Sequence, residues 1–263
     1  MSYTANDIMT VTAARRLRDE AVCFVGIGLP STAANLARLT HAPNINLIYE
    51  SGTIGTRPSV LPLSIGDGEL ASTAETVVST PEIFRYWLQG GRVDVGFLGA
   101  AQVDRFGNLN STVIGPYVQP ATRLPGAGGA PEIAAHARET FVMAKASPRS
   151  FVPQLDFRTS AGFGEGSGAR KRTTARGGGP RAVITDFGIL APHPTTDELQ
   201  LVALFADATI DEARAAVGWP LRIAETVDAV PPPTAHELDT LRALHARTRA
   251  AHAQPVVLPA LSP

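Results

Sequence analysis

Short apolar runs that end in glycine turns and lead into helical segments constrain the fold of this chain most strongly. Residues 21–28, AVCFVGIG, predict a buried strand that stops at a turn. Residues 29–40, LPSTAANLARLT, follow with helical spacing, and Ser31 is placed to cap this helix. Residues 45–50, INLIYE, predict a second buried strand that ends at Glu50. This order of strand, glycine turn and helix is typical of α/β proteins.

The alternation continues along the chain. Further strands are predicted at VDVGFLGA, ETFVMAKAS, SFVPQLDFRT, PRAVITDFGIL and LQLVALFA, and further helices at DIMTVTAARRLRD, PEIFRYWLQGG, PEIAAHA, TIDEARAAVGW and HELDTLRALHARTRAAHA. Asp7 is expected to cap the first helix, Arg105–Asn108 to form a hairpin turn, and Asp228 to precede the connection to the last helix. Residues 52–80, rich in Gly, Ser, Thr and Pro, predict an irregular excursion beside a site. We expect one domain of residues 1–263, built on an open, mainly parallel sheet with helices on both faces.

Composition excludes several classes of protein. With 263 residues, of which 44% are hydrophobic and 18% charged, the chain can bury a sizeable core. A net charge of -1 means that the chain lacks the excess of basic residues that would attract nucleic acid or an anionic membrane surface. The N-terminus lacks the apolar stretch of a signal peptide, and no apolar run approaches the ~20 residues of a membrane span. A single cysteine and scattered histidines predict neither a disulfide nor a metal site. These features favour a soluble cytoplasmic protein.

Two features could carry chemistry. Glu50 ends a strand, and in open α/β sheets ligands bind outside the carboxyl ends of strands. A capping or salt-bridging glutamate is the alternative. Residues 126–130, GAGGA, could bring backbone amides close to an anion, or could be a flexible connector to the helix that follows. GIGLPS at 26–31 lacks the third glycine of a dinucleotide fingerprint and the lysine of a P-loop, which favours a tight turn.

Other candidate groups favour structural roles. No G-x-S-x-G elbow is present, and Cys23 lies in an apolar run typical of core. Tyr86 and Trp87, on the helix that starts at Pro81, are also expected in the core. The polar segment 162–181, GFGEGSGARKRTTARGGGPR, predicts a flexible surface loop, which would border a pocket if it lies near the site.

Five motifs, taken in order, resemble the β subunits of family I CoA-transferases, the glutaconate CoA-transferase type most closely. They are VGIGLPSTAANLA, IYESG, GAAQVDRFGNLNSTVIG, TRLPGAGGA and AVITDFGIL, and the similarity covers most of residues 5–230. The resemblance implies that Glu50 is the nucleophile. It also implies that Gly126, Gly128 and Gly129 lie against the reacting thioester carbonyl. A CoA-transferase-like open α/β fold is implied too, with the active site at an interface with a separate α-type subunit, in a heterodimer or heterotetramer.

The implied chemistry suits these residues. Coenzyme A would be a substrate rather than a permanently bound cofactor, exchanged between an acyl-CoA and a small carboxylic acid. A free carboxylate is already ionised at neutral pH and needs no adjacent base. Glu50 would attack the acyl-CoA carbonyl, and a glutamyl-CoA thioester would follow, which is covalent catalysis with ping-pong kinetics. Backbone amides of the glycine segment would stabilise the oxyanions.

Two alternatives remain. The superfamily includes subunits of ring-opening hydrolases that act on CoA thioesters; these lack the ESG glutamate, which this chain keeps at Glu50. A non-catalytic ligand-binding relative is the other. A sugar-phosphate isomerase of related architecture would need a lysine near the glycine segments, but the only lysines in the sequence are Lys145 and Lys171. A DNA-binding regulator would carry a basic helix-turn-helix segment, and none is evident. The acid substrate is not specified by any residue.

Overall fold

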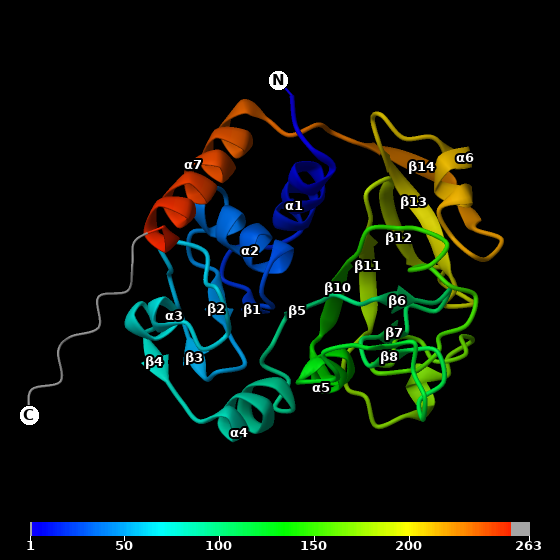
Figure 1. Ribbon diagram of the computed structural model, residues 1–263, viewed down its shortest axis with the longest axis horizontal. Coiled ribbons are helices and arrows are strands. Elements are labelled where there is room, and N and C mark those ends of the chain that lie inside the picture. Colours follow the sequence, from blue (N-terminus) through cyan, green and yellow to red (C-terminus); the bar gives the residue numbers. More distant parts are fainter. Residues whose placement is uncertain (1, 254–263) are drawn as a thin grey trace, which may run out of the picture.

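A ten-stranded sheet forms the centre of the computed structural model, which describes residues 2–253 (Figure 1). Its strands lie in the order β14-β13-β12-β11-β10-β5-β1-β2-β3-β4. Their bounds are β1 (Val22–Phe24), β2 (Asn46–Ile48), β3 (Thr53–Ile54), β4 (Thr76–Val77), β5 (Val95–Leu98), β10 (Glu139–Met143), β11 (Pro180–Ile184), β12 (Gly188–Pro192), β13 (Leu199–Phe205) and β14 (Arg222–Val230). Two small hairpins lie outside this sheet: β6 (Gln102–Val103) with β7 (Leu109–Asn110), and β8 (Val113–Ile114) with β9 (Thr122–Arg123).

Parallel strands make up the middle of the sheet, from β2 across β1, β5 and β10 to β11. Cys23 of β1, for example, lies beside Leu47 of β2 and Val95 of β5. Both flanks add antiparallel strands, β3 and β4 on one side and β12 and β13 on the other, before β14 again pairs in parallel. The α/β class is confirmed. The sheet is mixed at its flanks because tight turns after β2 and β11 return the chain directly to the neighbouring position.

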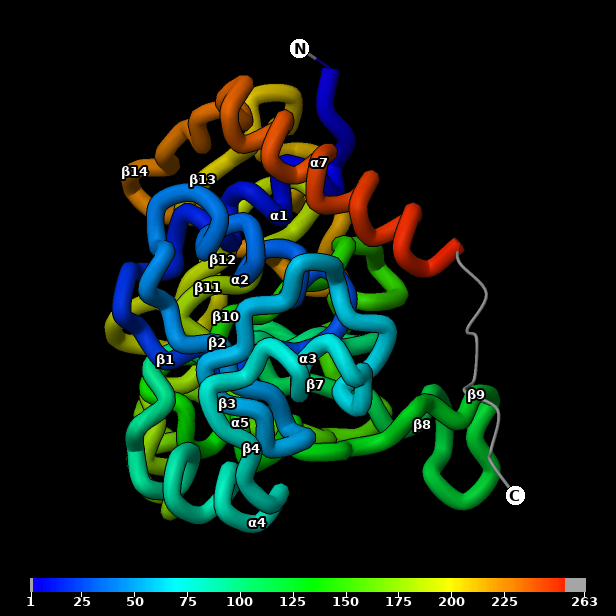
Figure 2. The backbone as a smooth tube through the Cα atoms, turned by 90° about the vertical axis from the view of Figure 1, so that its left-hand side faces the viewer, coloured from blue at the N-terminus to red at the C-terminus, as the bar shows by residue number. Residues whose placement is uncertain are grey.

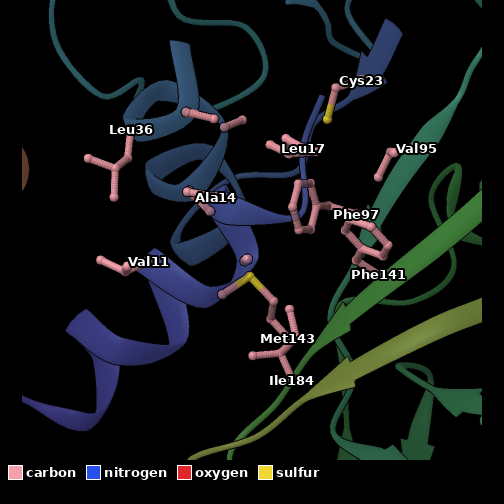
Figure 3. Packing of buried hydrophobic residues seen from close by; sticks show 14 of the residues in the cluster. Val11, Ala14, Leu17, Cys23, Leu36, Val95, Phe97, Phe141, Met143 and Ile184 are labelled. Atoms are coloured by element: carbon pink, nitrogen blue, oxygen red, sulfur yellow. The ribbon is translucent and has the colours of Figure 1, made fainter. Parts of the chain in front are cut away.

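One face of the sheet is covered by three helices, α1 (Ala5–Arg15), α2 (Leu29–Leu39) and α7 (Ala235–His252) (Figure 1). Figure 3 shows Val11 of α1 and Leu36 of α2 in the same buried cluster as Phe97 and Phe141 of the central strands. The two phenylalanine rings meet edge to face, with centroids 5.7 Å apart. This cluster fixes the central strands and so the loops at their carboxyl ends.

The opposite face carries shorter helices: α4 (Thr80–Glu82), which continues as the π-helix η1 (Ile83–Leu88), then α5 (Ala130–His136) and α6 (Ile210–Ala215). Helix α5 packs directly on the backbone of β5. A Cβ atom on Gly96 would come 2.4 Å from Cγ2 of Ile133, so only glycine fits beneath this helix. The remaining helical turns are α3 (Gly68–Ser72) and η2 (Arg170–Arg172).

Two helix starts differ from the sequence-based expectation. Thr4, not Asp7, caps α1, and Asp7 is its partner in a reciprocal capping box. Helix α2 begins after Gly28, with Pro30 in its first turn, so Ser31 lies inside the helix and is buried. Both changes follow from residues that precede the expected caps, Thr4 as a side-chain cap and proline as a good first-turn residue.

Two strand predictions were wrong. The segment SFVPQLDFRT at 150–159 forms only isolated bridges, at Phe151 and at the adjoining Ser160, in keeping with Pro153, which has no amide hydrogen to donate to a neighbouring strand. Strand β14 was missed, and Asp228 lies within it rather than in a connection. Most β14 residues are exposed or half-buried because it is an edge strand, so the apolar pattern is weak.

Residues 111–126 form a projection from the body of the molecule. Its hairpin, β8 with β9, stands clear of the other elements in Figure 2. The neighbouring hairpin of β6 and β7 confirms the turn expected at Arg105–Asn108. Within residues 2–253, no helix combines the length and the apolar character needed to cross a bilayer.

Candidate active site

Glu50 stands in a tight turn at the carboxyl end of β2. The turn is closed by two backbone hydrogen bonds: the amide of Gly52 donates to the carbonyl of Tyr49 (3.0 Å), and the amide of Tyr49 to the carbonyl of Thr53 (3.1 Å). Gly52 has φ of 102°, and a Cβ atom there would come 1.9 Å from the carbonyl oxygen of Val78. Only glycine is compatible with this backbone, which is why the glycine of ESG sets the position of the glutamate.

Tyr49 anchors this turn to helix α2, on the face of the sheet that is covered by α1, α2 and α7. Its side chain is fully buried, and its hydroxyl lies 3.0 Å from Oγ of Ser31 in α2. Burial raises the pKa of Tyr49 to about 12, so the phenol stays neutral and available for this hydrogen bond. Ser31 therefore serves as a buried partner of the residue next to Glu50, not as a helix cap. No pattern in the sequence indicated this contact.

The Glu50 carboxylate lies against the glycine segment that begins α5. A Cβ atom on Gly129 would come 3.1 Å from Oε1 of Glu50, and one on Gly128 would lie 3.9 and 4.0 Å from the two carboxylate oxygens. Glu50 is half-buried, and its carboxylate has no hydrogen bond or ion pair within residues 2–253. A capping or salt-bridging role is therefore not what holds Glu50 here.

Gly126 has a different place from the other two glycines. Its amide donates to the carbonyl of Ser111 (2.9 Å), and its carbonyl accepts from Oγ of Ser111 (2.8 Å). A Cβ atom on Gly126 would meet no atom within 4 Å. The amides of Gly128 and Gly129 donate to no acceptor in the described part of the chain. The structure thus brings Gly128 and Gly129 to Glu50, while Gly126 holds the start of the glycine segment to Ser111 by two hydrogen bonds.

Phe84 completes this contact, and the sequence did not single it out. A Cβ atom on Gly129 would come 2.5 Å from Cζ of Phe84, and the Phe84 ring also packs on Phe24, with centroids 5.9 Å apart. Tyr86 was expected in the core but is 63% exposed, whereas Trp87 is half-buried against the core cluster. The π-helical turn changes the helical spacing there, so a periodicity of 3.6 residues does not assign these faces correctly.

The position of this group in the fold favours ligand binding. From β1 the chain runs to β2 on one side, and β5 later pairs with β1 on its other side. Such a reversal of strand order is a topological switch point, where open α/β sheets bind ligands at the carboxyl ends of the strands. Ser51, next to Glu50, has a buried hydroxyl oxygen without a partner within residues 2–253. Leaving such a group unpaired costs about 1–3 kcal/mol, so a ligand or another chain that bonds to it would be favoured.

Other candidate groups are structural. Burial and the nearby Asp94 carboxylate raise the pKa of the Cys23 thiol far above its usual range, which keeps it unreactive. No cluster of metal-ligating side chains occurs among the residues that the structure describes. Burial raises the pKa of Asp104, whose oxygens accept hydrogen bonds from Phe106 and Asn108 and so hold the β6–β7 turn.

The segment 162–181 lies at the surface in part, but it also contains buried residues that its polar composition did not predict. Lys171 and Arg172 are exposed, but Arg170 between the glycines is only 7% exposed and bonded to backbone carbonyls. A cavity of about 450 Å³ borders this segment and is lined by Asp104, Arg105, Phe106, Pro153, Gln154, Leu155, Arg158, Gly164 and Glu165. Glu50 is not among its lining residues.

Comparisons with known proteins identify the family of this chain. A family model described as Coenzyme A transferase matches residues 6–215. The chain is 60% identical to the B subunit of 3-oxoadipate CoA-transferase from Pseudomonas knackmussii over 253 residues, which cover 96% of this chain and 97% of that one. It is 33% identical to the B subunit of glutaconate CoA-transferase from Acidaminococcus fermentans over 237 residues, 88% of each chain.

Solved structures give the same result. The crystal structure of glutaconate coenzyme A-transferase from Acidaminococcus fermentans superposes with a TM-score of 0.86 at 30% identity, over 92% of this chain and 94% of that one. The decarboxylase AibA/AibB superposes with a TM-score of 0.79 at 25% identity, over 95% and 98% of the two chains. A cholesterol ring-cleaving hydrolase IpdB subunit of Mycobacterium tuberculosis is 24% identical over 255 residues, 92% of this chain and 94% of that one.

Proposed function

Because the chain belongs to the coenzyme A transferase family as a β subunit, we propose that it carries the nucleophile of a two-subunit CoA-transferase and that Glu50 is this nucleophile. The observation that carries the proposal is the unpaired Glu50 carboxylate beside the backbone of Gly128 and Gly129, at 3.1 Å from the position of a Gly129 Cβ atom. A carboxylate beside a backbone segment can be reached by a carbonyl carbon, and no cation within residues 2–253 forms an ion pair with this one.

The proposed reaction proceeds through covalent intermediates. An oxygen of Glu50 attacks the thioester carbon of an acyl-CoA, and the C–S bond breaks to release CoA thiolate and leave an acyl-glutamyl anhydride. The thiolate then attacks the glutamyl carbonyl carbon, which gives a glutamyl-CoA thioester and releases the donor carboxylate. An acceptor carboxylate repeats both steps in reverse and leaves as a new acyl-CoA, with Glu50 regenerated. Coenzyme A is a substrate throughout, and the scheme needs no permanently bound cofactor.

Each addition places negative charge on a carbonyl oxygen. The amides of Gly128 and Gly129, in the segment that lies against Glu50, donate to no acceptor within residues 2–253. We propose that they stabilise this oxyanion, since removal of one such donor typically costs ~3–4 kcal/mol of transition-state stabilisation. Gly126 contributes indirectly, because its hydrogen bonds with Ser111 are already made.

An α-type subunit is the proposed partner. The relatives are named as B subunits, and two of the related solved structures are named as pairs, AibA/AibB and IpdAB. Ser51 and the glycine amides leave polar groups without partners within residues 2–253, as expected if the substrate and a second subunit complete the site. The relative with 60% identity is named for 3-oxoadipate, and we propose a small dicarboxylate of that type as the acceptor acid.

Hydrolysis or decarboxylation is the second candidate function, since structures named for a hydrolase and a decarboxylase, IpdAB and AibA/AibB, share the fold. The ESG glutamate favours transfer. The test is to purify this chain with an α-type subunit and incubate the complex with an acyl-CoA donor and 3-oxoadipate. We expect 3-oxoadipyl-CoA and the donor acid in equal amounts. Free coenzyme A released in step with donor acid, without a new thioester, would establish hydrolysis instead. Full turnover by this chain alone would refute the need for the partner.

A further inference from the structure

Arg170 is a buried cation that bonds to backbone carbonyls instead of a carboxylate. It is 7% exposed, and burial lowers its pKa from the usual value. Within residues 2–253 its guanidinium forms no ion pair, and its donors reach the carbonyl oxygens of Gly177 (2.8 Å), Ala161 (3.3 Å), Gly162 (2.9 Å), Ala134 (2.6 Å) and Ala135 (3.2 Å). Because burying a charge is costly, such complete pairing indicates that the position of Arg170 is strongly determined.

These bonds join two segments of the chain. Ala134 and Ala135 belong to the last turn of α5, where carbonyl groups lack partners inside the helix and where a positive charge is favoured. The other acceptors lie within or beside segment 162–181. Two further bonds reinforce the join: the amide of Gly177 donates to the carbonyl of Ala135 (2.8 Å), and that of Gly178 to the carbonyl of Arg138 (2.7 Å). The carboxyl end of α5 is therefore clamped by this segment.

The other end of the same helix is at Glu50. Helix α5 begins at Gly129 as its cap and has 7 residues, so its ends are about 10 Å apart. Ile133 seats the middle of the helix on β5, and Phe84 abuts its start. A shift at the carboxyl end of so short a helix would reach the glycine segment, because close-packed protein interiors transmit strain.

We propose that Arg170 is a positioning residue of the active site: by clamping the carboxyl end of α5, it sets the distance between the Gly128–Gly129 backbone and the Glu50 carboxylate. The proposal rests on the proposed function of Glu50. It assigns a role in turnover to a residue that touches neither substrate nor nucleophile. It also explains why an arginine, with donors in a planar fork, stands where several carbonyls converge.

The test uses the complex with the α-type subunit and the variants Arg170→Lys and Arg170→Met. Arg172→Met is the matched control, because Arg172 is exposed two positions further along and its bond to the Ser167 carbonyl is long, at 3.5 Å. Active sites are counted by the glutamyl-CoA thioester that forms before acceptor is added, and kcat is then expressed per counted site. KM for the acyl-CoA and the melting temperature are measured beside it.

We expect kcat per counted site to fall about 10-fold in Arg170→Lys and about 100-fold in Arg170→Met, as a displacement near 1 Å can produce, with KM changed less. Partial rescue by lysine is expected because an ammonium can reach some of the carbonyls. If Arg170→Met fails to fold, Gly178→Ala gives a second displacement, since its Cβ atom would come 2.8 Å from the Arg138 carbonyl oxygen. This variant should also lower kcat per site.

Two outcomes would overturn the proposal, and they are distinguishable. Fewer sites or a lower melting temperature with unchanged kcat per site in Arg170→Lys would show a purely structural role. Wild-type complex that turns over without any glutamyl thioester would refute the function of Glu50 itself, and the positioning role with it.

Discussion

Glu50 and Gly129 lie so close that a methyl group on Gly129 would come 3.1 Å from Oε1 of the glutamate. The two residues belong to different elements, the turn after β2 and the start of α5. They meet because a helix that crosses between parallel strands starts at the carboxyl edge of the sheet, the same edge at which β2 ends. This contact brings the proposed nucleophile next to the backbone of the glycine segment.

Substitution of Glu50 should abolish the covalent route. Glu50→Gln keeps the shape of the side chain but is a poor nucleophile, so transfer should fall to background. Glu50→Asp withdraws the carboxylate by about an ångström and should lower kcat roughly 100-fold. Glu225→Gln is the control, because Glu225 is exposed on the edge strand β14. Steady-state kinetics of the three complexes decide the matter, and substantial transfer by Glu50→Gln would exclude Glu50 as the nucleophile.

Gly129→Ala should impair turnover more than folding. Its φ of −83° suits alanine, but the new methyl group would lie 2.5 Å from Cζ of Phe84 and 3.1 Å from Oε1 of Glu50. We expect kcat to fall about 10- to 100-fold with little change in melting temperature. The control is Gly68→Ala, where a Cβ atom meets nothing within 4 Å. A near-normal kcat in Gly129→Ala would show that the glycine segment is only a connector between elements and has no role in turnover.

Gly128→Ala should behave differently from Gly129→Ala. Gly128 has φ of 49°, in the left-handed region, while its Cβ atom would be at ordinary contact distance from Glu50. The variant should lower the free energy of unfolding by about 1 kcal/mol. Chemical denaturation measures this loss, and a free energy of unfolding equal to that of the wild type would contradict the backbone strain.

Phe84 should be coupled to Gly129. Leucine lacks the ring atoms Cζ and Cε1 that a Gly129 methyl group would meet at 2.5 and 2.8 Å. Phe84→Leu in the Gly129→Ala background should therefore recover part of the lost turnover, with a coupling free energy of about 1 kcal/mol. Each single variant and the double variant complete the cycle. Strictly additive losses would mean that Phe84 is not what displaces the glycine segment.

Glu237 should make stability depend on acid pH. Burial opposes its ionisation, but hydrogen bonds from Arg15 and Thr234 outweigh burial and lower its pKa from 4.5 to about 2. A lowered pKa in the folded state stabilises the protein fully above pH 4.5, and this stabilisation is lost as the pH falls through about 2. Glu237→Gln should lower the free energy of unfolding by about 1.5–3 kcal/mol at neutral pH, and the difference should shrink below pH 4.5.

The matched control for Glu237 is Glu212→Gln. Glu212 forms the same capping box at the start of α6, where its carboxylate accepts hydrogen bonds from the amide and the hydroxyl of the cap residue Thr209. Glu212→Gln should lower the free energy of unfolding by less, because no hydrogen bonds from an arginine such as Arg15 are removed. Equal losses at both positions would attribute the effect to helix capping alone.

Much of the fold was predictable because buried parallel strands are continuous apolar runs that end in glycine turns. VCF and NLI are examples, and both form central strands. Edge elements were harder. β14 presents a half-exposed pattern, and segment 150–159 is apolar but pairs only at isolated bridges. Single-domain organisation over 1–263 stays a prediction, and residues 254–263 lie outside the described part of the chain.

The candidate site was predictable in part. The motif ESG and the glycine segment were identified from the sequence, but which glycine meets Glu50 depends on hydrogen bonds with Ser111 that no motif encodes. Phe84 lies on a π-helical turn, and the hydroxyl of Tyr49 bonds to Ser31 of helix α2, so both roles arise only from tertiary packing. Arg170 was hidden in a polar, glycine-rich stretch whose composition is typical of flexible loops.

The central claim, that Glu50 is the covalent nucleophile, is tested most directly by trapping. The complex with the α-type subunit is incubated with acyl-CoA in the absence of acceptor acid, treated with borohydride or hydroxylamine, and digested for peptide mass mapping. A glutamyl-CoA thioester should be converted at Glu50 alone to the alcohol or the hydroxamate, and the same peptide should be unmodified without acyl-CoA. Modification at another residue, or no modification in a preparation that catalyses transfer, would contradict the account.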